Sequence, residues 1–208
     1  MDNCFSHVNF YPWVGKNYNK GILNGKKVLI LGESHYCKDE LTEGGRCFPC
    51  CDQGKMSKEC HNQTILNECN GKAFTTFERA VYGRILTQQE RDNFWEGVVF
   101  YNYFQYSQPR PRCLLNQSKL EDSELAFKEI LEKYIPDYII AWGFRLYDLL
   151  PDWKGTHSEI IIGDDKRSVW TYHIGNKDIP VLSIEHPSSG MSWEYCHQFI
   201  KEFLSLKE

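Results

Sequence analysis

The sequence predicts an α/β domain: a three-layer sandwich in which helices cover both faces of a central, mostly parallel sheet of four to five strands. Apolar, β-branched runs recur along the chain at residues 26–32, 98–104, 138–143 and 180–184. Segments with helical spacing of apolar residues separate these runs, and polar side chains follow each strong run. Strands that alternate with helices pair in parallel, because each helix returns the chain to the same end of the sheet.

The strongest strand signal is the run at residues 26–32, which ends in Gly32. A continuous β-branched run of this kind is typical of a strand that is buried on both faces of a parallel sheet. The later runs have the same character, although the last is short. Residues 159–162 and 168–173, joined through a Gly-Asp-Asp turn, predict a hairpin that covers an edge of the sheet.

Helices are predicted between these strands. Thr75 or Thr76 is placed to cap a helix that carries Phe77, and Thr87 opens a capping-box sequence that ends in Glu90. Three further segments have helical character: residues 123–134, a short stretch through Leu146 and Leu149, and residues 193–206. Each of these would pack an apolar face against the sheet.

The composition indicates one domain over residues 1–208, with a Cys-rich insertion at about 37–71. A hydrophobic content of 41% supplies enough apolar surface for a core, which excludes a disordered or fibrous chain. No stretch approaches the ~18 apolar residues that cross a bilayer, and no signal peptide opens the chain. We therefore predict a cytoplasmic protein that does not bind membranes, and we expect a monomer. The net charge of −4 confines any nucleic-acid contact to a local site, such as one at Arg110 and Arg112.

Residues capable of chemistry follow the strand signals. They are Glu33, Ser34, His35 and Tyr36 after the first run, Asn102 and Gln105 at or beyond the end of the second, Trp142 at the third, and His186, Ser188 and Ser189 after the fourth. Ligands of open α/β sheets bind beyond the carboxyl ends of the strands, where the loops converge. We therefore expect these side chains to meet around one hollow sized for a flat heterocycle. Each residue alone is equally consistent with a structural role, for instance as a group that satisfies buried backbone atoms.

Three segments in order resemble the uracil-DNA glycosylase superfamily. Residues 28–36 resemble its first strand with the G-x-x-x-Y-type loop, and residues 100–105 resemble its asparagine-bearing strand. Residues 186–189, His-Pro-Ser-Ser, resemble its H-P-S loop. The three motifs cover a small part of the chain, but the α/β alternation between them is also similar to that fold. The resemblance implies a uracil-DNA glycosylase-like domain that acts in DNA repair.

The implied activity is hydrolysis of the N-glycosidic bond that joins a base to its sugar. Positive charge develops on the sugar and negative charge on the departing base, so a carboxylate and a donor both favour the transition state. Glu33 would assist water, His186 would donate to the base, Asn102 would read its edge, and Phe74 would stack on the flipped ring. The remaining expected contacts are Gly32, His35 and Tyr36 around the pocket, and Ser188, Ser189 and Met191 against the nucleic-acid backbone. Phe74 and Phe77, the two candidates for stacking, fit a hydrophobic core better than a stacking role.

The first motif departs from the family pattern at two positions. Ser34 stands where the commonest members carry an Asp or Asn, and serine without an adjacent base activates water poorly. His35 replaces the usual proline. Some branches carry a G-E-x-P-type motif, which Gly32 and Glu33 resemble, so Glu33 is the expected catalytic carboxylate. The alternative is a catalytically inactive module that binds nucleic acid or nucleotides.

The Cys-rich insertion predicts a metal site. Cys47, Cys50, Cys60, His61 and Cys69 have spacings able to surround one structural zinc, which would hold an otherwise structureless loop. A reduced thiol cluster without metal is the alternative, and a loop that docks a partner protein is another. Superfamily members with an iron-sulfur cluster carry their cysteines chiefly ahead of the first motif, so we expect no such cluster here. The expected partner is nucleic acid, DNA rather than RNA, or a ligand that contains a nucleobase.

Overall fold

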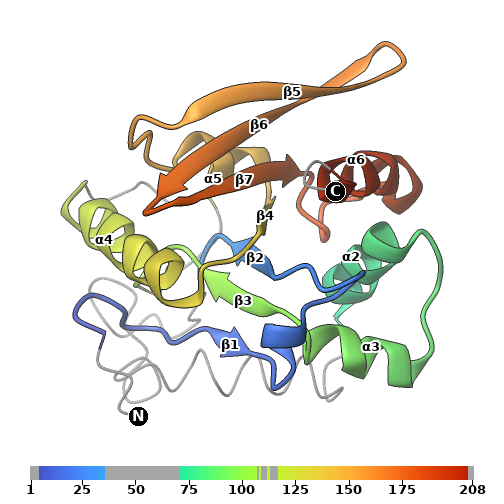
Figure 1. Cartoon of the computed structure of the whole chain (residues 1–208), viewed down its shortest axis with the longest axis horizontal. Coiled ribbons are helices and arrows are strands. Elements are labelled where there is room, and N and C mark those ends of the chain that lie inside the picture. Colours follow the sequence, from blue (N-terminus) through green and yellow to red (C-terminus); the bar gives the residue numbers. More distant parts are fainter. Residues whose placement is uncertain (1–4, 36–70, 107, 109–111, 113–116, 206–208) are drawn as a thin grey trace.

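The computed structural model describes residues 5–35, 71–106, 108, 112 and 117–205 (Figure 1). Its strands form one seven-stranded sheet with the order β1-β3-β2-β4-β7-β6-β5. The strands are β1 (Trp13–Val14), β2 (Val28–Gly32), β3 (Val99–Asn102), β4 (Tyr138–Trp142), β5 (Thr156–Ile162), β6 (Asp165–Ile174) and β7 (Lys177–Ile184). The helices are η1 (Tyr18–Lys20), α2 (Lys72–Tyr82), α3 (Gln88–Trp95), α4 (Gln117–Tyr134), α5 (Phe144–Asp148) and α6 (Trp193–Ser205).

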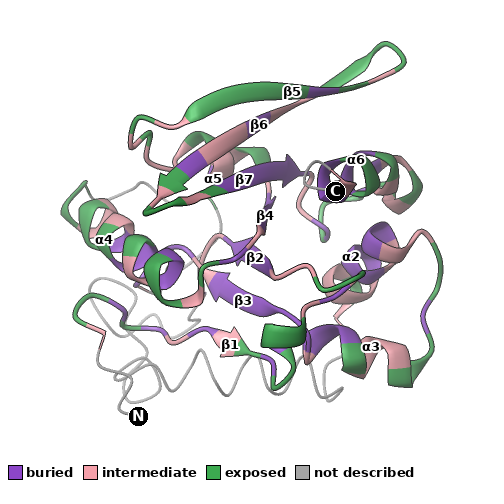
Figure 2. Cartoon of the chain, viewed as in Figure 1, coloured by how far each residue is buried: buried purple, intermediate pink, exposed green. Residues whose placement is uncertain are grey.

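The centre of the sheet is parallel. β2 pairs with β3 on one side and with β4 on the other, and β4 pairs with β7, all in parallel. Every residue of β2 and β4 is buried, as the purple strands of Figure 2 show. The apolar runs of the sequence therefore predicted the four central strands, because a strand covered on both faces needs no polar alternation.

The predicted sheet of four to five mostly parallel strands is wrong. The sheet has seven strands and is mixed, because β1 pairs with β3, β6 with β7, and β5 with β6 in antiparallel fashion. The predicted hairpin is present as β5 and β6, but it extends the sheet edge through β6–β7 hydrogen bonds instead of covering it. A two-residue strand such as β1 carries no periodic signal of its own, which explains its absence from the prediction.

Helices lie on both faces of the sheet (Figure 1). On one face, α2, α3 and α6 bury Phe77, Phe94 and Phe199 against the sheet in a single core cluster. On the other face, α4 and α5 bury Phe127 and Leu146 in a second cluster. The two clusters take alternate residues of each central strand, since successive strand side chains point to opposite faces.

Local sequence signals explain several helix boundaries. The capping box predicted before α3 is present: the Thr87 hydroxyl accepts from the backbone N–H of Glu90, whose carboxylate accepts in return from the N–H of Thr87. α2 ends at Gly83, which has a left-handed backbone with φ of 68°. α4 begins at Gln117, six residues ahead of the predicted start at Ser123. Within the described ranges, no helix is long and apolar enough to cross a membrane.

Candidate functional site

A cavity of about 390 Å³ opens at the carboxyl ends of the parallel strands. We call it the strand-end hollow. Its walls are the residues that follow β2, β4 and β7, together with one arginine from a separate loop: Glu33, Trp142, Gly143, Phe144, Arg145, Glu185, His186, Ser188, Ser189 and Arg112. The hollow thus lies where ligands of open α/β sheets bind, and its size is within the range of small-ligand sites, ~300–1,000 Å³.

Glu33 reaches the strand-end hollow directly after β2. Its Oε1 forms an ion pair with a guanidinium N–H of Arg145, which belongs to α5. The Glu33 side chain is 14% exposed and that of Arg145 is 33% exposed. An ion pair that is sheltered from solvent is stronger than one in open water. The pairing with Arg145 therefore holds the Glu33 carboxylate in place in the hollow.

His186 follows β7 and faces the same hollow. Its Nδ1 accepts a hydrogen bond from the backbone N–H of Ser188 (3.2 Å) and lies 2.7 Å from the Ser188 hydroxyl oxygen. A backbone N–H can only donate, so Nδ1 is unprotonated and the neutral ring carries its proton on Nε2. Burial lowers the pKa of His186, and the charge of Glu33 offsets part of this shift. The ring is therefore a neutral donor at pH 7, held edge-on to the indole of Trp142 (centroids 5.9 Å apart).

Asn102 lies outside the strand-end hollow. Its amide Nδ2 is 3.2 Å from Nε2 of His35, and its Oδ1 would lie 2.1 Å from a Cβ added to Gly32. Glycine at position 32 therefore permits the close approach of the Asn102 amide to the β2 backbone. The structure splits the expected set: Glu33 and His186 share one hollow, whereas Asn102 and His35 form a neighbouring polar pair.

His35 is buried, and the ring of Phe10 packs edge-on against it with centroids 4.7 Å apart. Burial lowers the pKa of His35 from its ordinary value of 6.5 to about 4. The imidazole is therefore neutral in the folded protein at pH 7.

This burial predicts a pH dependence of stability. Between pH 6.5 and 4 the unfolded chain binds a proton at His35 and the folded chain does not, so stability falls as the pH falls through this window. The loss due to His35 is about 3 kcal/mol, at 1.36 kcal/mol for each pKa unit. Urea denaturation at a series of pH values should give a flatter profile for His35→Gln. The variant His157→Gln, at an exposed histidine of β5, should keep the wild-type profile, and a wild-type profile for His35→Gln would contradict the prediction.

Some of the other expected site residues line the strand-end hollow, and others lie in the core. Ser188 and Ser189 line the strand-end hollow, and the Ser34 hydroxyl is buried without a hydrogen-bond partner among the described residues. Phe74 packs on Trp95, Phe100 and Trp142 at the edge of the core. Met191 is buried in the core cluster on that face of the sheet and is not one of the residues that line the hollow. Tyr36 and the expected zinc ligands Cys47, Cys50, Cys60, His61 and Cys69 lie outside the described residues.

Phe144 and Arg145 are among the residues of the hollow that had no place in the sequence prediction of the site. Arg145 is 112 residues from its partner Glu33, and no spacing rule connects two positions so far apart. Phe144 stands beside it with 40% of its surface exposed. The available signal was positional: both residues follow a buried strand, as Glu33 and His186 do.

No model of a known protein family matches this chain, and no curated protein matches it either. The resemblance to the uracil-DNA glycosylase superfamily therefore depends on the three motif segments alone. Of these, the first and third meet at the strand-end hollow.

Proposed function

We propose that the strand-end hollow binds a nucleobase with its sugar, and that the chain is a DNA glycosylase-like hydrolase of the N-glycosidic bond. The observation that carries this proposal is that Glu33 and His186 line one hollow from the ends of two parallel strands. The resemblance of the motifs around both residues to the uracil-DNA glycosylase superfamily supports it.

The two residues have complementary chemistry. Water attacks the anomeric carbon, a carbon–oxygen bond forms, and the carbon–nitrogen bond to the base breaks with its electron pair leaving on the base. Glu33 accepts the proton of the water and stabilises the positive charge on the sugar. The Nε2–H of His186 donates to the negative charge on the departing base. Because His186 is neutral, it donates this hydrogen bond from a ring that Ser188 holds in one tautomer.

The walls of the hollow suit a flat ring attached to a polyanion. Phe144, which is 40% exposed, provides aromatic surface on which a base can stack, and the buried Trp142 lines the hollow beside it. Arg112 brings a positive charge to the hollow, whereas the charge of Arg145 is paired with Glu33. A local cation such as Arg112 would contact a phosphate next to one flipped nucleotide.

Base release from labelled oligonucleotides tests the proposal. Single- and double-stranded DNA that carries uracil, hypoxanthine or other altered bases is incubated with the protein, and abasic sites are revealed by alkaline cleavage. We expect an abasic product from at least one substrate, and a loss of about 100-fold or more in Glu33→Gln. Glu159→Gln, at an ion-paired glutamate of β5, is the matched control and should retain full activity. Absence of abasic product from every substrate tested would contradict the proposal that the chain is a DNA glycosylase-like hydrolase.

A second candidate is a binding module without catalysis. The pairing of Glu33 with Arg145 favours it, since a carboxylate oxygen already held by a guanidinium is less free to bind and orient a water molecule. Ser34, at the family's usual water-activating position, has its hydroxyl buried. Fluorescence anisotropy with the same oligonucleotides separates the two candidates. If the protein binds the oligonucleotides without releasing a base, and Glu33→Gln binds them with the same affinity, the chain is a binding module without catalysis.

A further inference from the structure

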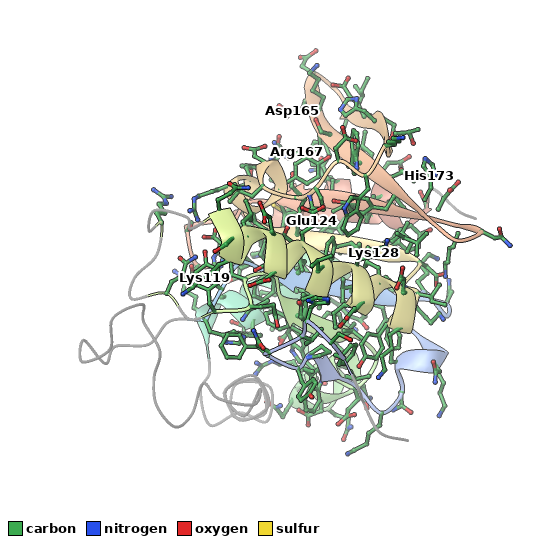
Figure 3. The ribbon with its side chains drawn as sticks, turned by 90° about the vertical axis from the view of Figure 1, so that its left-hand side faces the viewer. Lys119, Glu124, Lys128, Asp165, Arg167 and His173 are labelled. Atoms are coloured by element: carbon green, nitrogen blue, oxygen red, sulfur yellow. The ribbon has the colours of Figure 1, made fainter. Side chains whose placement is uncertain are left out.

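Arg167, on the hairpin formed by β5 and β6, contacts two residues that line the strand-end hollow, Phe144 and Glu185. Arg167 lies on β6 just before Val169, the first residue of β6 that pairs with β7. Figure 3 labels it on this hairpin, near Asp165. Its guanidinium carbon is 5.1 Å from the ring centroid of Phe144, 5.2 Å from that of Tyr195 and 5.1 Å from that of Phe199. Three rings from α5 and α6 thus enclose one cation.

The same guanidinium pairs with the loop that carries His186. Its NH2 group lies 2.5 Å from Oε1 of Glu185, and both side chains are largely sheltered, at 18% and 34% exposed. The second oxygen of Glu185 accepts from the buried thiol of Cys196 on α6 (3.0 Å). Both carboxylate oxygens are therefore held, one from the hairpin and one from the final helix.

Glu185 directly precedes His186, and both residues line the strand-end hollow. A carboxylate fixed at both oxygens restricts the backbone on which the next side chain stands. We infer that Arg167 is a positioning residue, which holds the Glu185–His186 loop so that the His186 imidazole keeps its place in the hollow. Other ion pairs of the hairpin lack this link, since Lys166 pairs with Glu159 within the hairpin itself.

This inference assigns to the hairpin a role in the site, and it rests on the proposed function for its kinetic consequence. A displacement of about 1 Å in a reacting group costs up to about 100-fold in rate. Removal of the guanidinium should therefore lower kcat by about 10-fold or more, with a smaller change in KM, because His186 acts on the departing base.

The test combines histidine NMR with kinetics on the full chain. Arg167→Met retains an apolar side chain among the three rings but loses the ion pair with Glu185. Arg167→Lys retains the positive charge but lacks the planar guanidinium group. Lys166→Met is the matched control on the neighbouring residue. The imidazole Cε1–H signals of the seven histidines are recorded for each protein, and that of His186 is assigned by its loss in His186→Gln.

We expect the His186 signal to shift in Arg167→Met, to return part of the way in Arg167→Lys, and to stay in place in Lys166→Met. An unmoved His186 signal in Arg167→Met would overturn the inference, as would an equal shift of all seven histidine signals, which indicates a general change of fold. The NMR result does not require turnover. If the protein releases no base but the His186 signal shifts as described, the proposed hydrolase activity is contradicted. The positioning role of Arg167 is still supported in that case.

Discussion

Replacement of Glu78 by alanine is expected to destabilise the protein by about 3–5 kcal/mol, which is the usual cost of breaking a buried ion pair from one side. Glu78 belongs to α2 and is 1% exposed. Its Oε2 accepts from Nε of Arg91 (2.6 Å), and its Oε1 accepts from the indole N–H of Trp95 (2.7 Å). The alanine variant leaves the sheltered cation of Arg91 and the buried indole donor of Trp95 without their carboxylate partner, and it removes two hydrogen bonds between α2 and α3.

Urea denaturation of the wild type and Glu78→Ala measures this loss. The matched control is Glu159→Ala, which removes the exposed ion pair with Lys166 (3.0 Å) on the hairpin and should cost less than about 1 kcal/mol. Glu78→Gln should fall between the two, since its amide oxygen can still accept from Trp95. Equal free energies of unfolding for Glu78→Ala and Glu159→Ala would show that the α2–α3 pair adds nothing to stability.

The second large effect is on catalysis. We expect His186→Ala to lower the rate of base release by about 10²–10³-fold, the range found when one donor to a developing negative charge is removed. The loss should appear in the rate constant measured under single-turnover conditions, because the donor acts on charge that is absent from the bound substrate.

Ser188→Ala is the companion variant for this measurement. The backbone N–H of Ser188 continues to donate to Nδ1 of His186 when the hydroxyl is removed, so the tautomer is preserved and the loss should be smaller. A His186→Ala variant with the kcat of the wild type would exclude His186 as the donor, even if base release itself is confirmed.

The elements that the sequence predicted best are those with the largest share of buried residues. β2 and β4 are buried throughout, and long apolar runs predicted them well. The capping box predicted α3 because its two hydrogen bonds involve residues three positions apart. β1 has two residues, too few to show a period, and the place of the hairpin depends on hydrogen bonds to β7 that no local pattern encodes.

The candidate site was predicted only in part, because the ends of the parallel strands can be read from the sequence and side-chain packing cannot. The rule that ligands bind beyond parallel strand ends correctly brought Glu33 and His186 together. It did not separate Asn102, whose amide packs against Gly32 and His35, because that choice depends on side-chain packing between β2 and β3. Arg145 and Arg167 pair with glutamates distant in the sequence, and only the folded chain shows these contacts.

The tight turn between β6 and β7 offers an attachment point. Gly175 has a φ of 60°, and a Cβ added there would contact nothing within 4 Å. The turn lies at the start of β7, whereas the hollow begins where β7 ends at Ile184, roughly 23 Å away at about 3.3 Å per residue. An affinity tag or fluorophore inserted between Gly175 and Asn176 would thus immobilise or label the molecule while leaving the strand-end hollow open, so that binding of the proposed oligonucleotide substrate can be measured.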